Sequence, residues 1–177
     1  MDPGTKCRDD GMVGGSISFV RQTPVIYPTP TALVAALPRH VRLAGLDLGE
    51  KTIGIAIGDP GHHVASPLTT IRRTKFTKDA TELIRILDER QIGGLVIGLP
   101  LNMDGSEGPR CQSVRQFAAN LKPLRDVPAT FWDERMSTMA VTRDMIAADM
   151  SRAKRAKVVD QSAAAFILQG ALDSLHR

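Results

Sequence analysis

Apolar residues recur at every second position in two short segments that begin near residue 42, and this period predicts β-strands. The predicted strands cover residues 42–48 and 52–58, and a third includes Ser66–Ile71. Between the first two lies Gly49-Glu50-Lys51, a short turn sequence that favours a β-hairpin. The domain is therefore expected to begin with three consecutive strands.

Further along, helical and strand-like segments alternate. Apolar residues at helical spacing predict helices in four stretches: Ala80–Leu87, Val114–Leu121, around Val141 and Met145, and Ala164–Leu175. Gly93-Gly94 is interpreted as a break before the nearly all-apolar strand Leu95–Leu99, and a further strand is expected at Ala129–Asp133. The order βββαβαβα, with a duplicated helix near its end, predicts an α/β protein whose mixed sheet carries helices on its faces.

The length of 177 residues suits one domain with an extension. Residues 1–24 mix Gly, Pro, Ser and charges without a period, so we expect a disordered N-terminal extension. Residues 25–41 are expected to form a short leading helix, capped by Thr31 and stopped by Pro38, and a linker. Residues 42–177 form the expected functional domain.

Composition limits the cell compartments in which the protein can be expected and the kinds of partner it can bind. No apolar run reaches the ~18 residues needed to cross a bilayer, so no membrane association is expected. The N-terminus lacks the apolar core of a secretory signal, and the two cysteines match no metal-ligand spacing or disulfide framework, which favours a cytoplasmic protein. A formal net charge of +4 is compatible with a polyanionic partner.

Asp47 stands where an apolar strand ordinarily places a buried residue. Buried acids are costly unless they are paired or bind metal. On the period-two pattern Asp47 shares a face with Gly45, and the next strand adds small residues at Gly54, Ala56 and Gly58. This face leaves room for a ligand to approach. The alternative is a strand-end aspartate that accepts hydrogen bonds from the turn.

Two more acidic positions lie near the ends of predicted elements. Asp133 and Glu134 are adjacent at the end of a strand, so only one of them can face Asp47 if both strands continue regularly; the pattern does not decide which. An acidic turn in solvent is the alternative. Asp160 precedes the last apolar helix, and its position taken alone favours an N-terminal cap of that helix over a functional acid.

Carboxylates brought together at one edge of a sheet are the ligands that Mg²⁺ or Mn²⁺ prefers. Paired metals of this kind orient and deprotonate water and stabilise the leaving oxygen of a phosphodiester. His62-His63 follows Pro60-Gly61 and is interpreted as a solvated loop instead. Phe131 and Trp132 are expected to belong to the core.

Basic and polar residues near the acids are candidates for binding nucleic-acid phosphates. They are Lys51, Asn102, Arg110, Arg135, Ser137, Thr138 and Lys157. Ordinary surface charge would explain each of them as well, and Ser137 could cap a helix. The basic stretch from Arg152 to Lys157 could be a solvated loop.

Four motifs in order resemble the YqgF/RuvX family of Holliday-junction resolvases or pre-ribosomal-RNA nucleases. They are Leu46-Asp47-Leu48-Gly49-Glu50-Lys51-Thr52-Ile53-Gly54-Ile55-Ala56, Val96-Ile97-Gly98-Leu99-Pro100-Leu101-Asn102-Met103-Asp104-Gly105, Asp133-Glu134-Arg135-Met136-Ser137-Thr138 and Val159-Asp160-Gln161-Ser162-Ala163-Ala164. The resemblance covers roughly residues 42–175. Glu50 departs from the pattern, because relatives often carry Thr or a small residue after the glycine.

The resemblance implies a ribonuclease-H-like fold with a mixed five-stranded sheet and helices on both faces. It also implies metal-binding acids at Asp47, at Glu134 with Asp133 beside it, and at Asp160, of which Asp47, Glu134 and Asp160 would be catalytic. The expected loop Gly98-Leu99-Pro100 lies near this edge.

The function implied by the resemblance is metal-dependent hydrolysis of nucleic-acid phosphodiesters, trimming the 5′ end of the precursor of small-subunit (16S) ribosomal RNA in ribosome biogenesis. The alternatives are cleavage of branched DNA junctions in recombination and repair, and nucleic-acid binding without catalysis. A nucleotide-binding protein of the sugar-kinase and actin-like group is disfavoured, because those proteins usually close two such domains over the nucleotide. A monomer and a homodimer both remain open.

Overall fold

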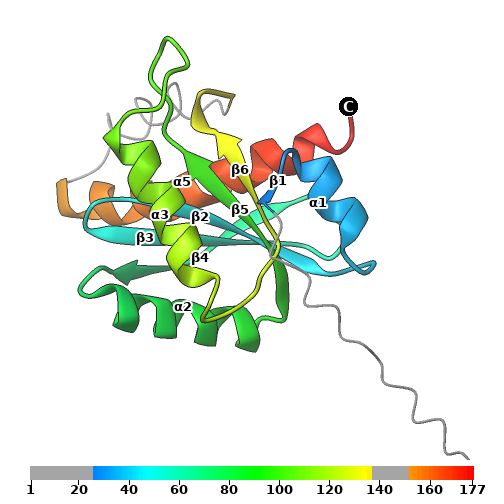
Figure 1. Ribbon diagram of the computed structural model, residues 1–177, viewed down its shortest axis with the longest axis horizontal. Coiled ribbons are helices and arrows are strands. Elements are labelled where there is room, and N and C mark those ends of the chain that lie inside the picture. Colours follow the sequence, from blue (N-terminus) through cyan, green and yellow to red (C-terminus); the bar gives the residue numbers. More distant parts are fainter. Residues whose placement is uncertain (1–25, 137–151) are drawn as a thin grey trace, which may run out of the picture.

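The computed structural model describes residues 26–136 and 152–177, of which 152–162 are placed by their helical backbone alone (Figure 1). The strands are β1 (Ile26–Tyr27), β2 (Arg42–Leu48), β3 (Thr52–Gly58), β4 (Ala65–Arg72), β5 (Ile92–Leu99) and β6 (Ala129–Asp133). The helices are α1 (Pro30–Ala36), α2 (Phe76–Glu89), α3 (Pro109–Leu121), the 3₁₀ helix η1 (Glu134–Met136) and α5 (Arg152–Ser174). Within these ranges no helix has the length and apolarity needed to cross a membrane.

All six strands form one mixed sheet in the order β1-β6-β5-β2-β3-β4. The β2–β3 and β3–β4 pairs are antiparallel, as the predicted hairpin requires, whereas the β2–β5, β5–β6 and β1–β6 pairs are parallel. Strands β2 to β6 are the five that the sequence predicts. The sixth is β1, from the segment expected to be a linker, where Ile26 pairs with Ala129 at the sheet edge.

Helices cover both faces of the sheet, which confirms the α/β class. One core contains the apolar residues of α2 and α3 with the side chains of β2, β3 and β5 that point toward them. The second core lies on the opposite face, under α5 and α1 (Figure 1). Phe131 packs against the first core and Trp132 against the second, so both belong to the core as predicted. Strand β5 is nearly all apolar because helices cover it on both faces of the sheet.

Gly93 and Gly94 lie inside β5, so the break predicted there is wrong. The physical reason for a glycine at position 94 is a close approach rather than a turn. A Cβ on Gly94 would come within 2.7 Å of side-chain carbons of both Leu37 and Leu43. The strand therefore starts earlier than the apolar pattern alone indicates.

Two predicted helix starts are also corrected. Thr29, not Thr31, caps α1, and its hydroxyl oxygen accepts a hydrogen bond from the Ala32 amide at 3.1 Å. Helix α5 already includes Arg152, so the basic stretch to Lys157 is helical rather than a loop and Asp160 lies inside the helix rather than at its cap. Arg, Lys and Ala are good helix formers, which explains the early start.

Some predictions fall outside the described residues. These are the N-terminal extension 1–24, the helix around Val141 and Met145, and Ser137 and Thr138.

Candidate active site

Asp47 lies near the carboxyl end of β2, on the sheet face that α5 covers. The face is fixed by Gly45, because a Cβ there would lie 2.6 Å from the Ala164 carbonyl oxygen. Asp47 is two residues further along the same strand and so lies on the same face, as its period-two pattern predicted. Leu48 turns to the opposite core. Asp47 is partly exposed at this edge.

Glu134 follows β6 directly and reaches the same face. Its Oε1 atom lies 2.7 Å from the position that a Cβ would take on Gly98 of β5. Trp132, two residues earlier, contacts the position of Gly170 on α5, so this face of β6 is turned toward that helix. In the parallel pairs, Leu46 of β2 lies opposite Ile97 of β5, and Gly98 of β5 lies opposite Trp132 of β6. The carboxyl ends of these three strands therefore lie at one edge of the sheet.

Asp133 points away from this face. It pairs in register with Leu99, whose side chain belongs to the core under α2 and α3. Both carboxylate oxygens of Asp133 accept hydrogen bonds from Arg135, at 3.0 Å from Nε to Oδ1 and 2.7 Å from Nη2 to Oδ2. This guanidinium holds the pKa of the Asp133 carboxyl below its usual value. Of the adjacent acids, Glu134 is thus the one on the α5 face.

Arg135 also braces the loop between β5 and α3. Its Nη1 donates to the Met103 carbonyl oxygen at 3.3 Å. Within the loop, the Ser106 hydroxyl donates a hydrogen bond to Asp104 Oδ1 at 2.6 Å and accepts one from the side-chain Nδ2 of Asn102 at 2.9 Å. These loop contacts of Asp104 and Ser106 were not predicted from the sequence, since only the spacing of two and four residues hints at them.

Asp160 belongs to α5 and is close in sequence to the α5 residues that pack on β2. Leu172 is near Gly58, and Ala164 is over Gly45, so toward its N-terminus α5 runs along β2 in the direction of Asp47. Asp160 is four residues, or about one helical turn, before Ala164. Helix α5 therefore approaches the edge at which Asp47 and Glu134 lie.

The candidate metal-binding side chains that the structure describes at this edge are carboxylates. Among the side chains that the structure describes, no group of three or more His, Cys, Asp or Glu residues is placed to hold a metal ion. Two carboxylates, from Asp47 and Glu134, do share the α5 face, and the missing Cβ of Gly98 is what makes room for the second. Oxygen donors of this kind fit Mg²⁺ or Mn²⁺.

The other predicted nucleic-acid contacts are spread around this edge. Lys51 is exposed in the β2–β3 turn, and Asn102 is exposed in the loop after β5. The Arg135 guanidinium is occupied by Asp133. Lys157 lies in the part of α5 placed by its backbone alone.

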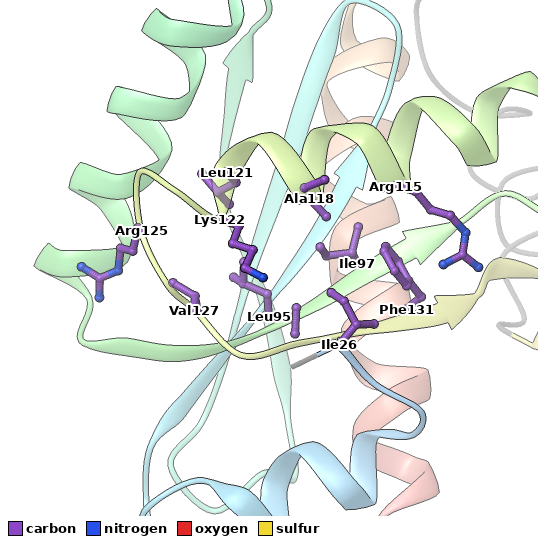
Figure 2. A pocket seen from close by; sticks show the side chains of 12 residues that line it. Ile26, Leu95, Ile97, Arg115, Ala118, Leu121, Lys122, Arg125, Val127 and Phe131 are labelled. Carbon is purple, nitrogen blue, oxygen red and sulfur yellow. The ribbon is translucent and has the colours of Figure 1, made fainter. Parts of the chain in front are cut away.

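An apolar cavity of about 270 Å³ lies elsewhere, between α3 and the β5–β6 edge (Figure 2). Leu95, Ile97 and Phe131 line it, and Arg115 and Arg125 lie at its ends. These arginines form ion pairs with Glu107 and Asp88. Because Ile97 and Phe131 belong to the core under α2 and α3, the cavity is on the sheet face opposite Asp47 and Glu134.

A family model described as RuvX: Holliday junction resolvase matches residues 41–174. The chain belongs to this family. The match includes Asp47, Glu134 and Asp160, and the mixed sheet with helices on both faces agrees with the ribonuclease-H-like fold expected for a RuvX protein.

Close relatives of this RuvX-family chain share most of its length. It is 61% identical over 145 residues to a protein of Paramagnetospirillum magneticum, covering 82% of this chain and 94% of the relative. A protein of Rhodobacter capsulatus is 58% identical over 151 residues, covering 85% and 95%. Both relatives carry the name "Putative pre-16S rRNA nuclease".

Solved structures are more distant. Thermus thermophilus RuvC in complex with a Holliday junction substrate aligns with a TM-score of 0.49 and 12% identity, covering 72% of this chain and 92% of that one. The yeast mitochondrial Holliday junction resolvase Ydc2 aligns with a TM-score of 0.46 and 12% identity, covering 86% and 81%. At these TM-scores the two likenesses carry no functional weight.

Proposed function

We propose that this chain is a divalent-metal-dependent nuclease that hydrolyses a phosphodiester in the precursor of 16S ribosomal RNA, near its 5′ end. One observation carries the proposal: Asp47 and Glu134 lie on the same face of the sheet, at the edge that α5 approaches with Asp160. The names of the relatives supply the substrate. The proposed partner is therefore nucleic acid, in the cytoplasm.

Asp47, Glu134 and Asp160 would hold Mg²⁺ or Mn²⁺ through carboxylate oxygens. The bound ion would supply charge stabilisation to the phosphoryl oxygens and lower the pKa of a water molecule. In the reaction a water oxygen forms a bond to phosphorus and gives up a proton, the bond from phosphorus to the leaving oxygen breaks, and the leaving oxygen takes up a proton.

The protein's own contribution is to fix where the carboxylates lie. Asp47 is held by a strand that pairs on both sides, with β3 and with β5. The Glu134 carboxylate packs against Gly98, and the Ile167 side chain of α5 packs against the same glycine. Carboxylates fixed on rigid elements need little rearrangement when the substrate binds, which favours catalysis. Asp133 is proposed to position Arg135 rather than to bind the ion.

A second candidate is cleavage of a Holliday junction in DNA recombination and repair. The description of the matching family favours it, and the same carboxylates would serve both reactions. Junction cleavage calls for two sites, which a symmetric dimer presents, whereas trimming of RNA needs one. A third possibility is a nucleic-acid-binding factor that does not cut.

The test is cleavage of labelled precursor 16S RNA and of a four-way DNA junction side by side, with Mg²⁺ or Mn²⁺ and with a chelator. The wild type is expected to cut the RNA only when metal is present, and Asp47→Asn to lose the activity. Cleavage of the junction alone would instead establish the second candidate. Binding of either substrate without any cutting would contradict the nuclease proposal.

A further inference from the structure

A polar cleft of about 410 Å³ lies beside the candidate active site, on the other face of the sheet. It begins at Leu48 and Gly49, directly after Asp47 in β2. Its remaining walls come from the segment that leads into α2, from the start of α2, and from the first two turns of α3, which contribute Arg110 and Ser113. The cleft and the carboxylates thus share one end of the sheet.

Two arginines line this cleft, and neither forms an ion pair with a carboxylate in the part of the chain that the structure describes. Arg73 is half-buried, and its Nη1 donates to the Gly49 carbonyl oxygen at 2.7 Å. Its guanidinium carbon lies 6.0 Å from the centre of the Phe117 ring. Arg110 is exposed and, like Arg73, forms no ion pair with any residue in the described part of the chain.

Some of the other arginines are neutralised, whereas others, such as Arg72 and Arg90, also form no ion pair in the described part of the chain. Carboxylates pair with Arg85, Arg115, Arg125 and Arg135. The two guanidinium groups in the cleft therefore lack the counter-charge that these surface arginines have. An anion with several oxygens is the ligand that planar, multiply donating guanidinium groups recognise.

Two helices begin at the cleft wall, and Asp79 places a carboxylate in the first turn of one of them, α2. The other is α3, and neither N-cap residue, Lys75 or Gly108, makes a side-chain capping hydrogen bond. Unsatisfied amides and the helix dipole favour an anion at such ends. Here two helix ends and two unpaired arginines meet in one cleft, so the proposal rests on their combination.

Two acids also lie in the cleft wall. The buried carboxylate of Asp79 accepts hydrogen bonds from the Thr74 amide at 3.0 Å and from its hydroxyl at 3.2 Å, and so serves the start of α2. Glu50 is exposed on the turn and has no ion pair in the described part of the chain. Its charge opposes anion binding.

We infer that this cleft binds a backbone phosphate of the nucleic-acid strand, next to the phosphodiester that is cut. The inference rests on the proposed function for its ligand class. Arg110 and Arg73 contact the phosphate oxygens, and Glu50 weakens the contact. The strand thereby runs from the α5 face across the end of β2 to the opposite face.

The experiment measures binding apart from cutting. Fluorescence anisotropy is recorded with a labelled single-stranded RNA that spans the 5′ end of mature 16S RNA, over a series of salt concentrations. All proteins carry Asp47→Asn so that cleavage does not interfere. Arg110→Ala is compared with Arg90→Ala, which removes the same charge from the exposed C-cap of α2.

Arg110→Ala is expected to weaken binding about tenfold and to reduce the slope of log affinity against log salt by about 0.7, as loss of one phosphate contact on a single strand requires. Arg90→Ala should change neither. Glu50→Gln should tighten binding about twofold. Equal effects of Arg110→Ala and Arg90→Ala would contradict the phosphate site in the cleft, as would absence of RNA binding. By contrast, a wild type that binds RNA but does not cleave it would contradict the proposed nuclease function and leave the phosphate site in the cleft standing.

Discussion

At the scale of single residues, the missing side chain of Gly98 decides where the Glu134 carboxylate can lie. A Cβ at position 98 would come within 2.7 Å of Glu134 Oε1 and 2.5 Å of Ile167 Cδ1. We predict that Gly98→Ala displaces the carboxylate, lowers metal-dependent cleavage by at least tenfold and costs about 1–3 kcal/mol of unfolding free energy. Urea unfolding and cleavage assays measure the two effects.

Gly58→Ala is the matched control. Gly58 faces the same helix at the other end of the sheet, where a Cβ would make ordinary contacts of 3.5 Å or more. It should retain cleavage. Equal cleavage by Gly98→Ala and Gly58→Ala would show that the position of Glu134 does not matter.

The sequence predicts the face of Asp47 but not the face of Glu134, for a physical reason. Asp47 lies within a regular strand, so the two-residue period and the small residue at Gly45 fix its side. Glu134 follows the end of β6, in a 3₁₀ turn that no strand period describes. Its side is set by contact with Gly98 on a neighbouring strand, which local sequence does not contain.

At the scale of elements, Arg135 connects η1 to the loop between β5 and α3. We predict that Arg135→Ala lowers the cleavage rate about tenfold with little change in RNA affinity, because the loop and Asp133 lose their brace while phosphate contacts remain. Single-turnover cleavage and anisotropy measure the two quantities. Arg85→Ala removes an equal charge from a surface ion pair on α2 and serves as the control.

A fall in affinity at an unchanged rate would contradict this positioning role. It would return Arg135 to the direct phosphate contact that its sequence position first indicates.

Elements with a complete local signal were predicted well, and those without one were not. The β2–β3 hairpin has two alternating strands and a turn sequence, and it is found with the predicted bounds. The first turns of α5 have no apolar stripe, and only their good helix formers indicate a helix. Strand β1 has two residues, and its pairing with β6 depends on contacts distant in sequence.

At the scale of the whole molecule, the sheet divides the protein into two working faces. Asp47 and Glu134 lie on the face of α5, whereas Asp133 and the arginine-lined cleft lie on the face of α2 and α3. Both faces meet at the end of β2, so a strand of nucleic acid could contact them together. Two acids that are adjacent in the chain, Asp133 and Glu134, therefore have different proposed roles.

The most direct test compares Glu134→Gln with Asp133→Asn in metal-dependent cleavage of labelled precursor 16S RNA. Both substitutions remove one charge at nearly constant shape. We predict that Glu134→Gln lowers the activity about 100-fold or more, as expected for a metal ligand. Asp133→Asn should stay within a few-fold of the wild type, because Asn can still accept a hydrogen bond from Arg135. An inactive Asp133→Asn beside an active Glu134→Gln would contradict the site.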